Sequence, residues 1–258
     1  MIVIVMENKA FGEIIGNPDT PYINRLAGKY GLALDYHAIR HPSLPNYLAL
    51  LGGSTFDIRS DCTDCRVDAP NLVDRLENAG ISWKAYMEGL PSPCFTGAVA
   101  GRYAKKHDPF MYFDDIATDP ARCSNVVALT QLDQDLDGHV LPRFVWITPD
   151  ECHNMHDCGV AEGDGFLKRL IPRLLPSLRP NGVLFLTWDE SSSYAGQDGG
   201  RVVTIVAGPT VRKGFRSDAR YTHYSLLHTI EESWGLPSLV HAPCACTLSM
   251  SAFFEAWP

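Results

Sequence analysis

The chain has 258 residues, of which 45% are hydrophobic and 20% are charged, a composition typical of a globular protein with a sizeable core. Its net charge is −8 and its 22 lysines and arginines are scattered, which excludes the basic patch of a nucleic-acid-binding protein. No apolar run approaches the length of about 20 residues that a membrane-spanning helix needs. The length fits one large α/β domain or two small ones.

Predicted strands and helices alternate along most of the chain. Residues 2–6 form a continuous apolar run, which predicts a buried strand rather than a signal peptide. Further strands are predicted at 32–39, 81–87, 144–147, 182–188 and 201–207. Helices are predicted at 21–31, 46–51, 70–79, 126–136, 162–178 and 225–234. This alternation predicts an α/β fold, a mostly parallel central sheet with helices on both faces, in a single domain over residues 1–258.

Residues 88–125 interrupt the alternation with an irregular segment that is rich in proline, glycine and aromatic residues. Long irregular segments inside compact domains commonly carry function. We interpret this one as an insertion that forms a lid or a wall of a substrate site.

Eight cysteines are many for a cytosolic enzyme of this size. They are Cys62, Cys65, Cys94, Cys123, Cys152, Cys158, Cys244 and Cys246. Their even number and loop-like contexts favour disulfides, including a Cys152–Cys158 bridge, with free thiols or a metal site as alternatives. We therefore expect a secreted or extracytoplasmic protein whose leader is absent from this chain, and a cytoplasmic location is the alternative.

The segment 41–47, His-Pro-Ser-Leu-Pro-Asn-Tyr, has one hydroxyl flanked by two prolines. Because proline disrupts regular structure, we expect the segment to be neither a regular helix nor a central strand. Pro45 suits the first turn of the predicted helix over 46–51, which places Ser43 just outside a helix N-terminus, where free N–H groups attract anions. Ser43 is then either a helix cap or a nucleophile presented to a phosphoryl group.

Potential metal ligands follow three of the predicted strands. Glu7-Asn8 follows the first strand, the segment 150–157 follows the strand at 144–147, and Asp189-Glu190 follows the strand at 182–188. Because the carboxyl ends of parallel strands share one edge of a sheet, we expect these residues to converge with Ser43. Carboxylate and amide oxygens favour Mg²⁺, Mn²⁺ or Ca²⁺, whereas histidine would favour Zn²⁺. Such a cation would activate the Ser43 hydroxyl and neutralise a phosphoryl oxygen.

A family resemblance becomes specific at this point. The segments that carry it, in chain order, are Met6-Glu7-Asn8-Lys9, residues 41–47, Met155-His156-Asp157, Thr187-Trp188-Asp189-Glu190 and Thr222-His223-Tyr224. Together they resemble the bacterial acid phosphatase and phospholipase C-type phosphoesterase family of the alkaline phosphatase-like superfamily. The pattern is most similar to that of small secreted mycobacterial-type acid phosphatases and extends from Ile2 to about Pro237.

The resemblance implies a site with one divalent metal ion and a serine nucleophile. The implied metal ligands are Glu7, Asn8, Ser43, Asp189 and Glu190. Ser43 would form a phosphoseryl intermediate that water hydrolyses. The implied residues around the phosphoryl group are His156 and His223 as catalytic residues, and His41, Asn46 and Asp157 as substrate-binding or supporting residues.

One departure from the family pattern bears on the number of metal ions. Many relatives carry an acid two residues before the matching histidine, whereas this chain has Asn154. We therefore expect one metal ion rather than two. The expected substrate is a small phosphorylated molecule or a phospholipid head group.

Other functions fit the sequence less well. A sulfatase would carry an arginine where this chain has Tyr47, and a serine esterase would need a Gly-X-Ser-X-Gly elbow, which is missing. A phospholipase C-type phosphodiesterase uses the same nucleophile and metal and stays open as an alternative. A metal-stabilised binding module is the non-enzymatic alternative, and we favour a phosphomonoesterase.

Overall fold

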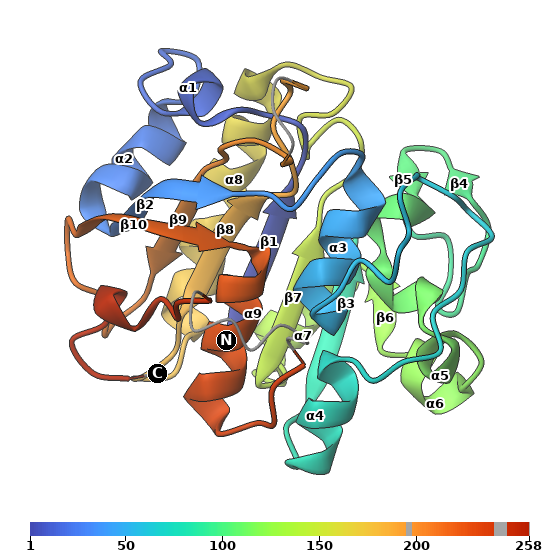
Figure 1. Cartoon of the computed structure of the whole chain (residues 1–258). Helices are drawn as coiled ribbons and strands as arrows, with labels where there is room; N and C mark the ends of the chain where they lie inside the picture. Colours follow the sequence, from blue (N-terminus) through green and yellow to red (C-terminus); the bar gives the residue numbers. More distant parts are fainter. Residues whose placement is uncertain (195–197, 240–246, 258) are drawn as a thin grey trace.

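The computed structural model describes residues 1–194, 198–239 and 247–257. Its main sheet has eight strands, which are β1 (Ile2–Met6), β2 (Gly31–His37), β3 (Trp83–Met87), β6 (Val126–Ala128), β7 (Phe144–Thr148), β8 (Leu184–Trp188), β9 (Thr204–Ala207) and β10 (Arg216–Thr222). Their order across the sheet is β10-β2-β9-β8-β1-β7-β3-β6 (Figure 1). Only β9 is paired antiparallel to its neighbours within this sheet, so the other strands end at one common edge.

Helices cover both faces of the sheet, as the sequence predicts. The longer ones are α2 (Pro21–Lys29), α3 (Ser43–Gly52), α4 (Leu72–Asn78), α7 (Gln131–Asp137), α8 (Val160–Leu174) and α9 (His223–Trp234). Helix α3 packs against α9 and α4 on the face that is nearer the viewer in Figure 1, whereas α2 packs against α8. None of the helices in the described part of the chain combines the length and the apolar character that a bilayer crossing requires.

The centre of the core is β1, which lies between β7 and β8. All five residues of β1 are buried, because helices cover the sheet on both faces. This is the arrangement that a continuous run of apolar residues predicts for a parallel sheet. The strand therefore delivers the polar residues that follow it to the middle of the carboxyl edge.

Helix α3 differs from the predicted helix over 46–51 because it begins earlier, at Ser43. The first four N–H groups of a helix have no partner within the helix, so Pro45 in the first turn removes no hydrogen bond. Ser43 is thus the first helical residue rather than a residue outside the helix, and the expectation that prolines exclude a regular helix here is wrong. Every residue of α3 is buried.

Two further differences concern strands. Strand β10 was not predicted, because its exposed polar residues mask the alternation of buried positions along Arg216–Thr222. The predicted helix over 126–136 is instead β6 followed by α7, since Val126–Ala128 pairs with β3. Short apolar runs are ambiguous between helix and strand, and pairing with a neighbouring strand decides the outcome.

The irregular segment 88–125 folds as a series of short elements. These are β4 (Val99–Ala100), β5 (Tyr103–Ala104), α5 (Asp114–Ala117), α6 (Pro120–Cys123) and the 3₁₀ helices η1 (Lys105–His107) and η2 (Pro109–Tyr112). Phe110 anchors the segment to the sheet, with its ring stacked on Trp83 at 5.5 Å and edge-on to Trp146 at 5.6 Å. The anchored segment holds η1 close to the carboxyl edge, beside α3.

Three disulfides link cysteines of the described residues: Cys62–Cys65, Cys94–Cys123 and Cys152–Cys158. The expected Cys152–Cys158 bridge is therefore confirmed. Cys244 and Cys246 lie outside the described residues. The Cys94–Cys123 bridge closes most of the irregular segment, with a sequence separation of 29 residues.

Replacing both Cys94 and Cys123 by serine should lower the free energy of unfolding by about 3 kcal/mol, because a long loop regains freedom in the unfolded chain. The matched control replaces Cys62 and Cys65, whose separation is only 3 residues, and should cost about half as much. Denaturant unfolding measures both changes. Equal losses in the two variants would contradict loop closure as the source of the stability.

Candidate active site

The ends of β1 and β8 place two acids side by side in the middle of the carboxyl edge. Met6 is paired with Trp188, so Glu7 and Asp189 follow at matching positions. The Asp189 N–H donates to the Met6 carbonyl at 2.9 Å, and the Asn8 N–H donates to Asp189 Oδ1 at 3.0 Å. Asn8 has a positive φ of 49°, a conformation that asparagine tolerates better than most residues. The turn after β1 is therefore held by Asp189 itself.

Ser43 lies between two carboxylates at the start of α3. Its Oγ is 3.2 Å from Glu7 Oε2 and 3.2 Å from Glu190 Oε1, and it can donate to either oxygen. Its side chain is buried, as are the carboxylates of Glu7, Asp189 and Glu190. The structure thus brings together the hydroxyl and the three acids that the sequence predicts for the site.

Tyr47, one turn further along α3, also contacts Glu7. Its hydroxyl donates to Glu7 Oε1, and its ring is stacked on His107 with centroids 5.4 Å apart. His107 Nε2 lies 3.2 Å from Glu7 Oε2. Burial lowers the pKa of His107 to about 3, so its ring is neutral. Glu7 is consequently hydrogen-bonded by neutral Tyr47, and neutral His107 lies beside it without a hydrogen bond from its buried Nε2.

Asn46 holds the loop that leads into α3. Its Oδ1 accepts from the N–H groups of Ile39 at 2.9 Å and Arg40 at 3.2 Å, and its Nδ2 donates to the carbonyls of Arg40 and Pro42. These four hydrogen bonds fix the backbone just before Ser43. The observed role of Asn46 is to position this loop.

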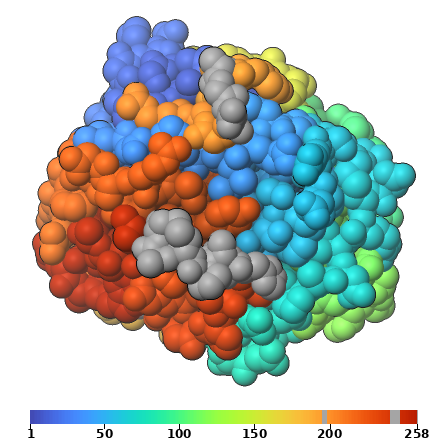
Figure 2. All heavy atoms as spheres, in the orientation of Figure 1, coloured from blue at the N-terminus to red at the C-terminus, as the bar shows by residue number. Residues whose placement is uncertain are grey.

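His41 lies on the outer side of Glu190. Its Nδ1 contacts Glu190 Oε2, and its Nε2 is 3.1 Å from the Ser193 carbonyl oxygen. Tyr194 is stacked on the His41 ring with centroids 4.1 Å apart. The segment after β8 therefore lies against His41, just before the start of α3. In Figure 2, blue atoms from the first third of the chain lie between orange atoms on one side and cyan atoms on the other.

His223 is the first residue of α9 and lies behind Asp189. Its Nε2 donates to the Asp189 carbonyl at 2.6 Å, and its Nδ1 accepts from the Tyr36 hydroxyl at 3.1 Å. Burial lowers its pKa to about 4, which keeps the ring neutral near neutral pH. Nε2 thus holds the backbone of Asp189, while Tyr36 fixes the ring through Nδ1.

His156 lies in the loop after β7. Its Nδ1 is 2.7 Å from Asp157 Oδ1 and 3.2 Å from Glu151 Oε2, and its Nε2 is 3.3 Å from Lys106 Nζ. Asn154 ties this loop to the site, because its side chain accepts from the His156 N–H at 2.7 Å and its carbonyl accepts from the Glu7 N–H at 2.9 Å.

The three acids beside Ser43 are held in an unfavourable electrostatic state without a cation. Burial, followed by repulsion from Asp189 and Glu7, raises the pKa of Glu190 to about 10. Burial and neighbouring carboxylates likewise raise the pKa of Glu7 and of Asp189. Asp189 Oδ2 is buried and has no hydrogen-bond partner. An oxygen-rich, buried and anionic site of this kind fits a hard divalent cation.

Two groups among the described residues have metal-ligating atoms that all lie within 4.8 Å of one another: Glu88, Asp150 and His153, and Glu151, His156 and Asp157. The carboxylates of Glu7, Asp189 and Glu190 do not form such a group in this structure. Both belong to the segment after β7 or contact it. The predicted set of Glu7, Asp189 and Glu190 surrounds Ser43 instead. The carboxyl edge of the sheet therefore carries several clusters of acidic residues, and the cluster that contains Glu7 and Glu190 contacts the Ser43 hydroxyl.

Sequence reasoning missed part of the site. Lys106, His107 and Asp61 lie in irregular segments that carry no recognisable motif. Tyr47 belongs to the 41–47 motif, but the motif predicts no contact between Tyr47 and Glu7. The sequence points to Lys106 and His107 only through their place in the 88–125 insertion, which we interpret as a lid or a wall of a substrate site. In the structure, His107 lies beside Glu7, and Lys106 lies beside His156. Asp61 accepts a hydrogen bond from the Leu44 N–H at the start of α3.

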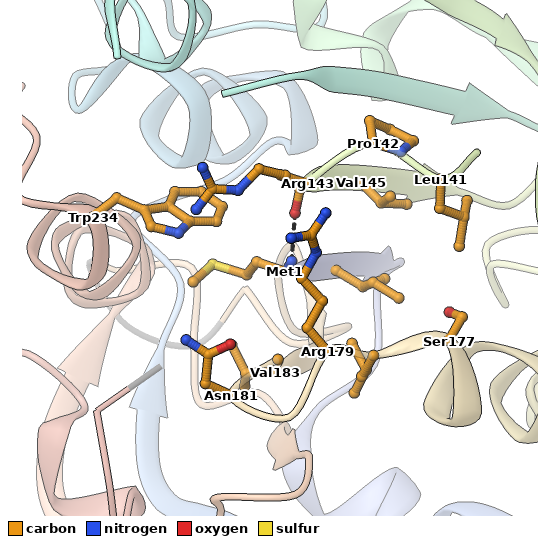
Figure 3. A pocket seen from close by; sticks show the side chains of 13 residues that line it. Met1, Leu141, Pro142, Arg143, Val145, Ser177, Arg179, Asn181, Val183 and Trp234 are labelled. Carbon is orange, nitrogen blue, oxygen red and sulfur yellow. Dashed lines mark hydrogen bonds between the residues drawn. The ribbon is translucent and has the colours of Figure 1, made fainter. Parts of the chain in front are cut away.

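A hollow at the opposite edge of the sheet is separate from this site. Figure 3 shows Arg143, Arg179 and Trp234 around the start of β1, with the Met1 amino group donating to the Arg143 carbonyl. The Arg143 guanidinium lies 5.9 Å from the centre of the Trp234 ring. The hollow lies at the amino ends of the strands, where parallel α/β sheets do not place their reactive groups.

Known structures of low sequence identity share the fold. A protein of the alkaline phosphatase superfamily from Vibrio parahaemolyticus aligns with a TM-score of 0.62 and 11% identity, over 92% of this chain and 66% of that chain. A phosphonate monoester hydrolase from Silicibacter pomeroyi aligns with a TM-score of 0.58 and 13% identity, over 98% and 76%. The chain therefore has an alkaline phosphatase-like fold.

Sequence comparisons define the family within that fold. The model of the Phosphoesterase family matches residues 16–237. The chain is 33% identical over 244 residues to a phosphatidylinositol-3-phosphatase of Mycobacterium tuberculosis, covering 94% of this chain and 79% of the relative. It is 30% identical over 237 residues to a phosphate-repressible acid phosphatase of Penicillium chrysogenum, covering 88% of this chain and 57% of that protein. The chain belongs to the phosphoesterase family, which confirms the resemblance seen in the sequence.

Stability of the metal-free protein should fall as pH rises. Glu190 has a usual pKa of 4.5 and a folded pKa of about 10, so its contribution is complete below pH 4.5 and is lost progressively up to about pH 10. Thermal unfolding of chelator-treated protein between about pH 5 and pH 9 measures the trend. Glu190→Gln, which stays neutral, should flatten it. An unchanged slope in Glu190→Gln would contradict the assignment.

Proposed function

We propose that this chain is a metal-dependent phosphoester hydrolase of the acid phosphatase type that acts on phosphomonoesters through Ser43. The observation that carries the proposal is the position of the Ser43 hydroxyl, 3.2 Å from both Glu7 and Glu190 at the N-terminus of a buried helix. A hydroxyl between two carboxylates that a cation can neutralise is a suitable nucleophile for phosphoryl transfer. Membership of the phosphoesterase family supports the same reaction class.

In the first step, Ser43 Oγ attacks the phosphorus atom and the bond from phosphorus to the leaving oxygen breaks. The Ser43 proton passes to a neighbouring carboxylate, for which Glu7 and Glu190 are in hydrogen-bond reach. The leaving alkoxide takes up a proton, and the product of the step is phosphoserine and an alcohol. In the second step, water attacks the phosphoserine, which releases inorganic phosphate and restores the hydroxyl.

The residues proposed to hold the cation are Glu7, Asn8, Ser43, Asp189 and Glu190. The raised pKa of each of the three acids and the unpartnered Oδ2 of Asp189 support this set. When bound, a divalent ion such as Ca²⁺, Mg²⁺ or Mn²⁺ supplies positive charge that lowers the pKa of the hydroxyl and neutralises a phosphoryl oxygen. Zinc is the alternative if a histidine joins the set.

The histidines have different proposed roles. His156, oriented by Asp157, is proposed to contact the phosphoryl group or to protonate the leaving oxygen. His223 carries the same prediction from the sequence, but its two hydrogen bonds favour a positioning role behind Asp189. His41 beside Glu190 and Asn46 under the entry loop are proposed to position the metal ligand and Ser43.

The alternative activity is that of a phospholipase C-type phosphodiesterase. A hemolytic phospholipase C of Pseudomonas aeruginosa is 24% identical over 210 residues, covering 68% of this chain and 29% of that protein. The same nucleophile and metal would serve a diester. The proposed substrates are therefore small phosphorylated molecules first and phospholipid head groups second, and the non-enzymatic alternative is a metal-stabilised binding module. The three disulfides support an oxidising, extracytoplasmic location.

Ser43→Ala should reduce hydrolysis of an aryl phosphate by at least about 10³-fold, because the nucleophile is removed. Release of the aryl alcohol measures the rate. The matched control is Ser54→Ala, which removes a hydroxyl just beyond the other end of α3 and should keep full activity. Full activity in Ser43→Ala would rule out the covalent mechanism, whereas loss in both variants would indicate a folding defect.

Chelation should inactivate the enzyme reversibly. Exhaustive treatment with EDTA should abolish aryl phosphate hydrolysis, and addition of one divalent ion at a time should restore it, since the acids beside Ser43 need a cation to ionise together. Asp189→Asn should lower the metal content measured by elemental analysis, because Asp189 supplies the unpartnered carboxylate oxygen. Activity that is indifferent to chelation would contradict the catalytic metal.

A further inference from the structure

We propose that Lys106 binds the phosphoryl group of the substrate and makes the site selective for phosphomonoesters over phosphodiesters. The proposal rests on the proposed function, because it assigns a second positive charge to the same reaction centre. Lys106 is supplied by η1, which belongs to the irregular insertion rather than to a strand end.

The position of Lys106 is fixed by its neighbour His107. His107 is buried against Tyr47 and Glu7, so η1 is anchored directly beside the carboxylates that surround Ser43. The Lys106 side chain is partly buried, with 21% of its surface exposed. Its ammonium group lies between Asp61 and His156, and His156 belongs to the loop after β7.

The contacts of the ammonium group lead back to the nucleophile. Lys106 Nζ lies 3.4 Å from Asp61 Oδ2, and Asp61 Oδ1 accepts from the Leu44 N–H at 2.9 Å. Leu44 directly follows Ser43 in the first turn of α3. The Asp61 carboxylate thus links Lys106 to the Leu44 amide, next to Ser43. It lies at the N-terminus of α3, where free N–H groups attract anions.

Neither contact of Lys106 is a short ion pair. Its distances of 3.4 Å to Asp61 and 3.3 Å to His156 Nε2 exceed the 2.7–2.9 Å that is typical of charge-assisted hydrogen bonds. An ammonium group has three donors and no acceptor, so two long contacts leave it able to bind an arriving anion. A phosphoryl group can take over these donors without breaking a strong internal pair.

The lysine is suited to binding charge rather than to transferring a proton. Burial works to lower the pKa of Lys106, but the carboxylates of Glu7, Asp61 and Glu151 outweigh this effect and raise it above its usual value. The ammonium group therefore stays charged during turnover.

Charge balance indicates which substrate gains from this arrangement. A phosphomonoester carries up to two negative charges on its non-bridging oxygens, whereas a phosphodiester carries one. The three acids outweigh the charge of one divalent ion, so Lys106 supplies the additional positive charge that a doubly charged monoester needs, on the side of His156.

The experiment compares Lys106→Met, Lys106→Arg and the surface control Lys168→Met in the metal-loaded enzyme. We expect Lys106→Met to lower kcat/KM by about 100-fold for an aryl phosphate but by less than about 10-fold for a bis-aryl phosphate. Binding of inorganic phosphate, measured by calorimetry, should weaken by about 10-fold. Lys106→Arg should recover part of each loss, and Lys168→Met should change none of them.

Equal losses on both substrates, or unchanged phosphate affinity in Lys106→Met, would overturn the proposal, because a purely structural role would not separate the two esters. Thermal unfolding verifies the fold, and Lys106→Gln replaces the methionine variant if the latter does not fold. If the wild-type enzyme fails to hydrolyse aryl phosphate, the proposed function fails, and phosphate affinity alone then decides the role of Lys106.

Discussion

The burial of three neighbouring carboxylates, to which repulsion adds, is the constraint on which the rest of this structure depends. Glu7 and Asp189 follow two strands that are paired residue by residue, so the backbone cannot move them apart to relieve the repulsion. Glu190 is the next residue along, and all three side chains are buried. The sheet therefore places beside Ser43 three acids whose ionisation is unfavourable, and the proposed divalent cation would favour their charged forms. The register of β1 and β8 therefore places Glu7 and Asp189 side by side.

The remaining polar groups can be understood from their position around these acids. Neutral partners hold them in place: Tyr47 and His107 contact Glu7, and His223 bonds to the backbone of Asp189. The positive charge of Lys106 comes from the insertion instead and lies further out. In the proposed reaction, a phosphoryl group would thus meet Ser43 and the three acids on one side and Lys106 on the other. This separation allows attraction of an anionic substrate to a protein whose net charge is −8.

Local sequence patterns predicted strands well where all residues of the strand are buried. They predicted strands poorly where pairing with a neighbouring strand decides between helix and strand. The apolar run of β1 could be recognised because the strand is covered on both faces. The exposed polar residues of β10 hid its alternation, and the short run at Val126 fitted a helix equally well until pairing with β3 made it a strand. Ser43 was recognised as special, but its place inside the first turn of α3 depended on packing, since the whole helix is buried.

The sequence by itself determined the α/β class, most of the strands and helices, the family, and the residue types that are proposed to form a metal and nucleophile site. It did so because buried strands have an apolar signature and because the acids that follow them are adjacent in sequence to that signature. Only the tertiary structure decided which groups meet Ser43 from distant, motif-free segments: His107 against Tyr47, Asp61 on the Leu44 amide, and Lys106 between Asp61 and His156. Those contacts join residues with no common periodicity or spacing, so no local pattern can encode them, and they arise only when the insertion packs against α3.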